Sequence, residues 1–245
     1  MVVICKGYKT TYNPPKTQME VITLEKLSND VKLAIDSVVK HEIAVAKATN
    51  QREIEFNGIK KLSTRILLAA KACMVTPVHF NDLVTINRKI QGRKSAKVVS
   101  EIKKEGVLLA ENAKKKEAGS EFNLLDAKKR ISSTQQSFNR NLDNFGNLIE
   151  LLKATPEYKP NEADLKVNAL ADKLALMKLA NEMVVTAQVD LVNARIERNQ
   201  LMYLKENNLV DTAFGVKNYI RSVFGAKSVL NKNLVALKFN KPSVI

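Results

Sequence analysis

The sequence is poor in residues that break helices and in residues that build most catalytic or cofactor sites. Its 245 residues include 8 glycines, 6 prolines, 2 cysteines, 2 histidines and no tryptophan. Glycine and proline interrupt helices, and the long stretches between them are rich in Ala, Leu, Lys and Glu. This composition predicts an all-α fold, which we expect to be an elongated helical bundle.

The low number of cysteines and the short apolar runs bear on where in the cell the protein is expected. Cys5 and Cys73 are too few for a disulfide framework and lack the spacing of a zinc or redox motif. The apolar run before Lys6 is shorter than the 7–15 or so residues of a secretory signal core. Residues 66–70 end at Lys71, far below the roughly 18 that cross a bilayer. We expect no Sec signal, no transmembrane segment and a cytoplasmic location as synthesised.

The chain is strongly basic, with a formal net charge of +15. This charge would suit a polyanion, but nucleic-acid modules usually add aromatic side chains, which make up only 5% here. Nucleic-acid binding therefore stays possible without being favoured over a solvated basic surface. The candidate polyanion contacts are Lys94, Lys97, Lys114, Lys115 and Lys116.

Two segments of the chain resemble each other. YNPPKTQMEVITL at 12–24 is matched by YKPNEADLKVNAL at 158–170, and the ungapped alignment from these starts gives 11 identities in 45 positions. Unrelated sequences of ordinary composition would match at about one position in sixteen. The match predicts an internal duplication with pseudo-two-fold symmetry. We interpret the chain as one elongated helical domain, with repeats at 12–90 and 158–241 and a charged excursion at 92–131.

Each repeat should open with a very long helix. Proline suits a first helical turn, so the helices should begin after Pro15 and Pro160 and end near Gly58 and Asn207. Within both, apolar residues recur every seven positions, which is typical of a helix packed along its length. The predicted packing seam comprises Leu24, Val31, Val38, Val45, Leu170, Met177, Val184 and Leu191.

Shorter helices should complete the bundle. Residues 62–74 correspond to 209–224, and LVTI at 83–86 corresponds to LVAL at 234–237. Capping boxes at Ser132 and Ser133 predict one more helix, which should end before Pro156.

No convergent set of titratable residues indicates catalysis. His41 matches Ala187 in the other repeat and suits packing, while His79 lies in a Thr-Pro loop without a carboxylate pair. No HExxH motif, phosphate-binding glycine loop or pair of Glu-x-x-His motifs occurs. We therefore expect no catalytic, metal or cofactor-binding residue. Arg52 and Arg198 occupy matching seam positions and are candidates for a polar layer that sets helix register.

The segments SSTQQSFNRNLDNFGNLIELL, YKPNEADL, VNARIERN and LVDTAFGVKNYIRSVFGA also resemble a set of uncharacterised bacterial helical-bundle proteins. The similarity covers mainly residues 132–239. It implies a helical fold and no particular activity.

The duplication favours a non-enzymatic structural protein that self-assembles, or scaffolds a filament, tubule or sheath, through helix-bundle surfaces. A repeated half gives one chain related surfaces, and such contacts can propagate. The expected partner is the chain itself or another protein. Three alternatives stay open: a monomeric interaction module, a basic nucleic-acid-associated protein, and a component of a helical pore-forming toxin. In the last case the best insertion candidate, residues 66–78, is interrupted by Lys71.

Overall fold

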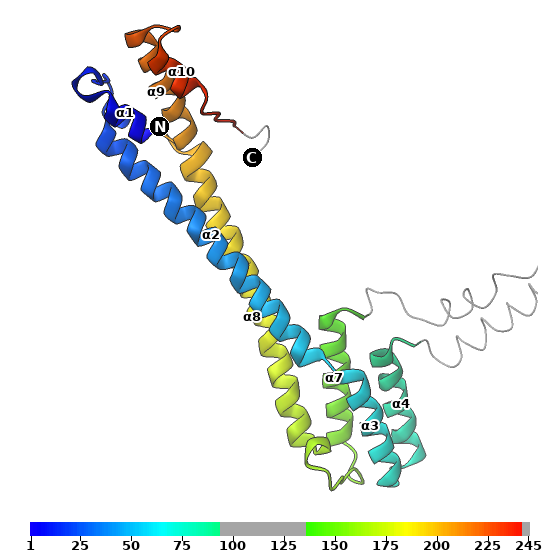
Figure 1. Ribbon diagram of the computed structural model, residues 1–245. Coiled ribbons are helices and arrows are strands. Elements are labelled where there is room, and N and C mark those ends of the chain that lie inside the picture. The colour runs from blue at the N-terminus through cyan, green and yellow to red at the C-terminus, as the bar shows by residue number, and fades with distance from the viewer. Residues whose placement is uncertain (94–135, 242–245) are drawn as a thin grey trace, which may run out of the picture. The chain divides into compact units, whose positions relative to one another are not determined.

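The computed structural model describes residues 1–93 and 136–241, which contain helices and no strand (Figure 1). This confirms the all-α class. The two longest helices have 36 and 33 residues, which confirms the expectation of two very long helices. The α-helices are α1 (Val2–Gly7), α2 (Val21–Phe56), α3 (Ile59–Ala72), α4 (Pro77–Gln91), α7 (Phe138–Lys153), α8 (Val167–Asn199), α9 (Leu209–Phe224) and α10 (Val229–Val235).

The chain divides into two compact units. The terminal unit comprises Met1–Lys47 and Val185–Ile245, and the central unit comprises Ala48–Val184. Helices α2 and α8 contribute residues to both units, so each unit draws on both of the similar sequence segments. The segment at 92–131 lies outside the described residues except for its first two, where Gly92 ends α4 in a left-handed conformation with φ 72°.

The central unit has its core among α3, α4, α7 and the adjoining parts of α2 and α8. Helix α7 supplies one continuous buried stripe, because Phe145, Leu148, Ile149 and Leu152 recur at helical spacing. None of these four side chains is more than 1% exposed. The stripe packs with Ile66 and Ala70 of α3, Leu83 and Ile90 of α4, and Leu170 and Met177 of α8.

The terminal unit has a separate core rich in tyrosine. Tyr8 packs on Phe224 with ring centroids 5.1 Å apart, and Tyr12 meets Tyr219 edge to face at 5.5 Å. Such tilted arrangements suit the quadrupoles of aromatic rings. The rings join a buried cluster that also includes Cys5, Met19, Leu24, Val216, Ile220 and Leu234.

Both long helices begin later than their prolines predict. The chain after Pro15 makes a short 3₁₀ turn, η2 (Thr17–Met19), before α2 begins at Val21. The same sequence of elements recurs as η4 (Ala163–Leu165) followed by α8 from Val167. All of these boundaries differ by the same 146 residues that separate the two similar sequence segments.

A buried tyrosine holds each of these turns in place. The Tyr12 hydroxyl donates a hydrogen bond to the Met19 carbonyl at 2.6 Å, and the Tyr158 hydroxyl donates to the Leu165 carbonyl at 2.9 Å. We call these contacts the tyrosine clamps. Each clamp spans seven residues. It supplies a hydrogen-bond donor to a backbone carbonyl that would otherwise be buried without one. The clamp therefore fixes where the long helix starts.

Other helix ends also differ from the predicted boundaries. Helix α8 gives way after Asn199 to a π-helical turn, η5 (Gln200–Leu204), so it ends before the predicted Asn207. Helix α7 begins at Phe138, where the Ser137 hydroxyl oxygen accepts a hydrogen bond from the Arg140 N–H group at 3.3 Å. The capping boxes at Ser132 and Ser133 lie outside the described residues.

Most residues of the predicted packing seam are buried in the structure. Six of its residues are at most 5% exposed, and Val45 and Leu191 are partly exposed. The six buried residues are Leu24, Val31, Val38, Leu170, Met177 and Val184.

We predict that Tyr158→Phe lowers the free energy of unfolding by about 1–3 kcal/mol, because the buried Leu165 carbonyl loses its hydrogen-bond donor. Urea denaturation followed by circular dichroism measures the change. Tyr203→Phe is the control, because that partly exposed hydroxyl has no hydrogen bond among the described residues. Equal stability of Tyr158→Phe and the wild type would contradict a stabilising role for the clamp.

Candidate functional site

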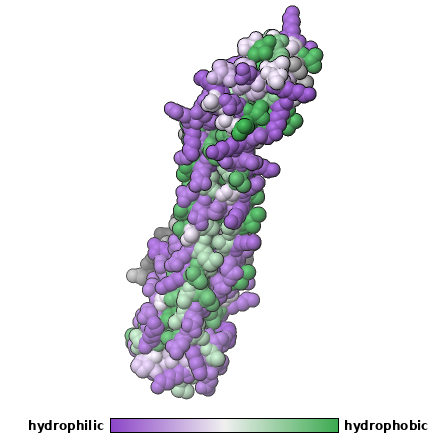
Figure 2. Space-filling view, turned by 90° about the vertical axis from the view of Figure 1, so that its left-hand side faces the viewer, coloured by the Kyte–Doolittle hydropathy of each residue, from purple (hydrophilic) through white to green (hydrophobic). Residues whose placement is uncertain are grey.

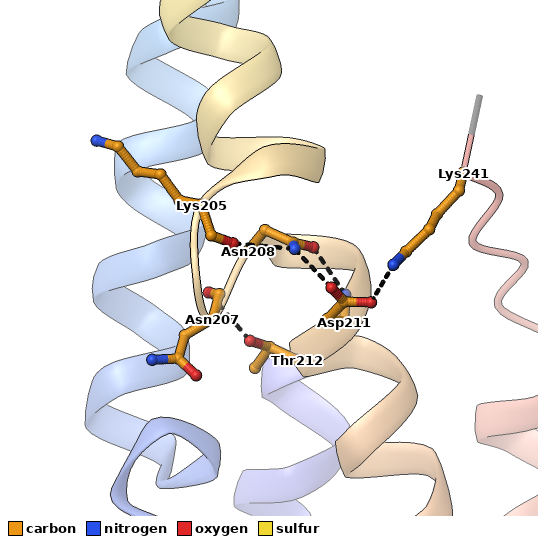
Figure 3. A network of polar contacts seen from close by, with 6 residues as sticks. All are labelled: Lys205, Asn207, Asn208, Asp211, Thr212 and Lys241. Carbon is orange, nitrogen blue, oxygen red and sulfur yellow. Dashed lines mark hydrogen bonds and ion pairs between the residues drawn. The ribbon is translucent and has the colours of Figure 1, made fainter. Parts of the chain in front are cut away.

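The best-defined polar cluster surrounds the start of α9, in the terminal unit (Figure 3). Asn208 caps the helix, because its side-chain oxygen accepts a hydrogen bond from the Asp211 N–H group at 2.9 Å. Its amide nitrogen donates to the Lys205 carbonyl at 3.1 Å and to the Asp211 carboxylate at 2.7 Å. Thr212 donates to the Asn207 carbonyl at 3.1 Å. These bonds satisfy local backbone groups, so the cluster serves as a helix cap.

An ion pair ties this cap to the C-terminal part of the chain. The Lys241 ammonium lies 2.5 Å from the Asp211 carboxylate, and both side chains are about half exposed. The bonds from Lys241 and then Asn208 hold the pKa of the Asp211 carboxyl below its ordinary value. Asp211 is therefore a charged structural contact, without the raised pKa expected of a general acid.

The structure places the two candidate arginines in different units. In the central unit, the Arg52 guanidinium lies 4.0 Å from the centroid of the Phe138 ring and donates to Asn181 at 3.5 Å. In the terminal unit, Arg198 donates to the neighbouring Asn199 side chain at 2.9 Å. Neither arginine forms an ion pair with a carboxylate in the described part of the chain.

A groove of about 760 Å³ lies beside Arg52 in the central unit, between the α2–α3 junction and α7. Phe56 and Phe138 form part of its wall, with ring centroids 5.0 Å apart. Glu53, Lys60 and Lys61 line it as well, and no described histidine or cysteine does. The groove could hold a group with both polar and apolar parts.

The histidines and cysteines do not converge on a site. His41 is half-buried in α2, and His79 lies in the first turn of α4, where the sequence had predicted a loop. Burial raises the pKa of the Cys5 thiol, which reduces its thiolate fraction and hence its reactivity. Cys73 packs against the central core. Among the described residues, no three His, Cys, Asp or Glu side chains are grouped to hold a metal ion.

The candidate polyanion contacts Lys94, Lys97, Lys114, Lys115 and Lys116 lie outside the described residues.

Exposed apolar side chains on the long helices are the feature that sequence reasoning missed. They occur at equivalent positions of α2 and α8, and Figure 2 shows green side chains among purple ones on its visible face. The sequence contained a signal for these residues, because they are apolar but fall outside the seven-residue positions of the packing seam. The equivalent exposed pairs are Leu33 and Leu179, Val39 and Val185, and Ile43 and Val189.

Comparisons of the chain with protein-family models, curated proteins and solved structures give no match. The resemblance over residues 132–239 therefore stays a prediction. Within the described helices, none combines the length and the apolar character needed to span a membrane.

We predict that Asp211→Asn is less stable than the wild type near neutral pH and that the difference shrinks in acid. A carboxyl group with a lowered folded-state pKa contributes stability above its unfolded pKa of about 3.9, and this contribution disappears as pH falls through the folded value. Urea denaturation at pH 7 and pH 3 measures both differences. Asp36→Asn, an exposed residue of the same unit, should show no such change. A difference for Asp211→Asn that stays constant with pH would contradict the ion pair.

Proposed function

We propose that this chain is a non-enzymatic structural protein that associates with itself through the outer surfaces of its long helices. The observation that carries the proposal is the repeated exposure of large apolar side chains at equivalent positions of α2 and α8. Such residues add nothing to the cores of the two units. Exposed apolar surface beyond scattered single residues is typical of protein interaction sites.

We further infer that the two long helices arose by internal duplication. The local structure supports this inference, because a tyrosine clamp, a 3₁₀ turn and a long helix follow one another at the same offset in both segments. Both clamps are buried and involve side chain and backbone in the same way. Local geometry of this kind is not required by the helical fold itself.

Duplication bears on assembly because it gives one chain two related surfaces. A surface that binds its own equivalent on another copy closes a dimer, whereas contact between two different surfaces continues into an open array. A filament, tubule or sheath is an open array. The exposed pairs Val39 with Val185 and Ile43 with Val189 lie on two related surfaces of this kind. A closed dimer needs only one of these surfaces, whereas an open array needs both.

Sedimentation velocity tests the proposal. The purified chain should form species larger than a monomer as its concentration rises from about 1 μM to 1 mM, a range that covers weak and moderate association. Negative-stain images of the most concentrated sample should show ordered particles. Because apolar contacts drive the association, it should persist in 0.5 M NaCl, where charge interactions are screened. A monomer at every concentration and salt would overturn the proposal.

A further inference from the structure

Four apolar residues form a stripe on the outside of α8, within the terminal unit. Val185, Val189, Val192 and Ile196 are each 48% to 56% exposed. Successive members are four, three and four residues apart, which is the spacing of a helix-packing seam. We call these four residues the α8 stripe.

The α8 stripe faces away from the seam that α8 already uses. A helix turns about 100° per residue, which places the centre of the stripe about 110° from Val184, about 130° from Leu191 and about 170° from Ala194. Of these three residues, Val184 and Ala194 are at most 5% exposed. Packing within the described unit therefore uses one face of α8 and leaves the stripe in solvent.

The composition around the stripe is unusual for a solvated helix face. Residues 185–196, which span the stripe, read VTAQVDLVNARI and contain two charged residues, Asp190 and Arg195, neither of them at a stripe position. Valine also favours helices less than lysine or glutamate does. Neither helix propensity nor solubility explains three exposed valines on one line of the helix. The four stripe positions are apolar, and a core without charged side chains is characteristic of the centre of a protein interface.

We propose that the α8 stripe binds the same stripe of a second copy, with the two helices antiparallel. This deepens the proposed self-assembly, on which it rests, by naming the surface. The spacing of four, three and four reads the same in both directions. In an antiparallel pair, Val185 of one copy therefore faces Ile196 of the other, and Val189 faces Val192. The contact is isologous and satisfies both copies at once.

The residues beside the stripe favour this partner. Thr186, Gln188 and Asn193 flank it and carry no charge. Arg195 also flanks it, but its charge is paired with Glu42 at 2.8 Å, which reduces like-charge repulsion between two copies.

Charged Glu182 and polar Asn199 occupy the next stripe positions at the two ends. In the antiparallel register these two end residues face each other. If the helices shifted along their axes, one of these residues would be buried against a valine.

The equivalent face of α2 has fewer large apolar residues and is flanked by lysines. Val39 and Ile43 are 49% and 52% exposed and correspond to Val185 and Val189. The next positions, however, carry Ala46 and Asn50 in place of Val192 and Ile196. Lys40 and Lys47 flank this face, and pairing it with itself would bring lysines together. The α2 face therefore takes no part in this contact and serves as a natural control for it.

The α8 contact should be weak when it acts alone. Stable protein interfaces bury about 800 Å² on each partner, and four half-exposed side chains supply less than that. Association must therefore be measured over a wide concentration range.

Val189→Glu tests the proposal in the full-length chain. A buried carboxylate near the centre of the contact should weaken self-association by at least about tenfold, as measured by sedimentation equilibrium. Val189→Thr nearly preserves shape and should weaken it less. Ile43→Glu places the same charge at the equivalent exposed position of α2 and should leave association unchanged. Circular dichroism checks that each variant keeps its helices.

Each outcome decides the proposal. Weakening by Val189→Glu alone supports the α8 stripe as the contact. If all variants associate like the wild type, the stripe is not the contact, although self-assembly through another surface would stand. If Ile43→Glu weakens association as much as Val189→Glu, the assignment to α8 is overturned. A wild type that stays monomeric overturns both this inference and the proposed function.

Discussion

Burial of one heptad-spaced face on each long helix is the interaction on which the rest of the structure depends. In the terminal unit the face is represented by Leu24 and Val38, and in the central unit by Leu170 and Met177. Ion pairs link α2 to α8 beside it: Glu42 meets Arg195 at 2.8 Å in the terminal unit, and Glu55 meets Lys173 at 2.7 Å in the central unit. These exposed or partly exposed pairs add little energy, so apolar burial dominates. A helix that packs through one face leaves its other faces available for contacts with other molecules.

The tyrosine clamps connect this packing to the local chain. Burial raises the pKa of the Tyr158 hydroxyl to about 12 and also raises that of Tyr12, so both stay protonated donors at any physiological pH. By holding the turn before each long helix, the clamps set where α2 and α8 begin. The two cores then differ in their companions, which are α3, α4 and α7 in one unit and α1, α9 and α10 in the other.

Much of the fold could be predicted from the sequence, because a seven-residue apolar period specifies both a helix and its buried face. The boundaries of the range 209–224 agree with α9, where Asn208 and Gly225 give clear start and stop signals. The starts of α2 and α8 could not be predicted, since each depends on a tyrosine reaching a carbonyl seven residues away. The contacts of Arg52 with Phe138 and Asn181 join distant segments, and its sequence neighbours say nothing about them. The spacing of the α8 stripe is present in the heptad register. The sequence alone, however, does not distinguish an exposed apolar residue from a buried one.

We propose that α8 uses one set of heptad positions within the chain and another set between copies. Methyl NMR of valine- and isoleucine-labelled protein over a concentration series tests this separation most directly. We expect the signals of Val185, Val189, Val192 and Ile196 to change with concentration, while those of Val39, Ile43 and buried Val184 stay constant. Signals that are all independent of concentration, or changes confined to α2, would contradict it.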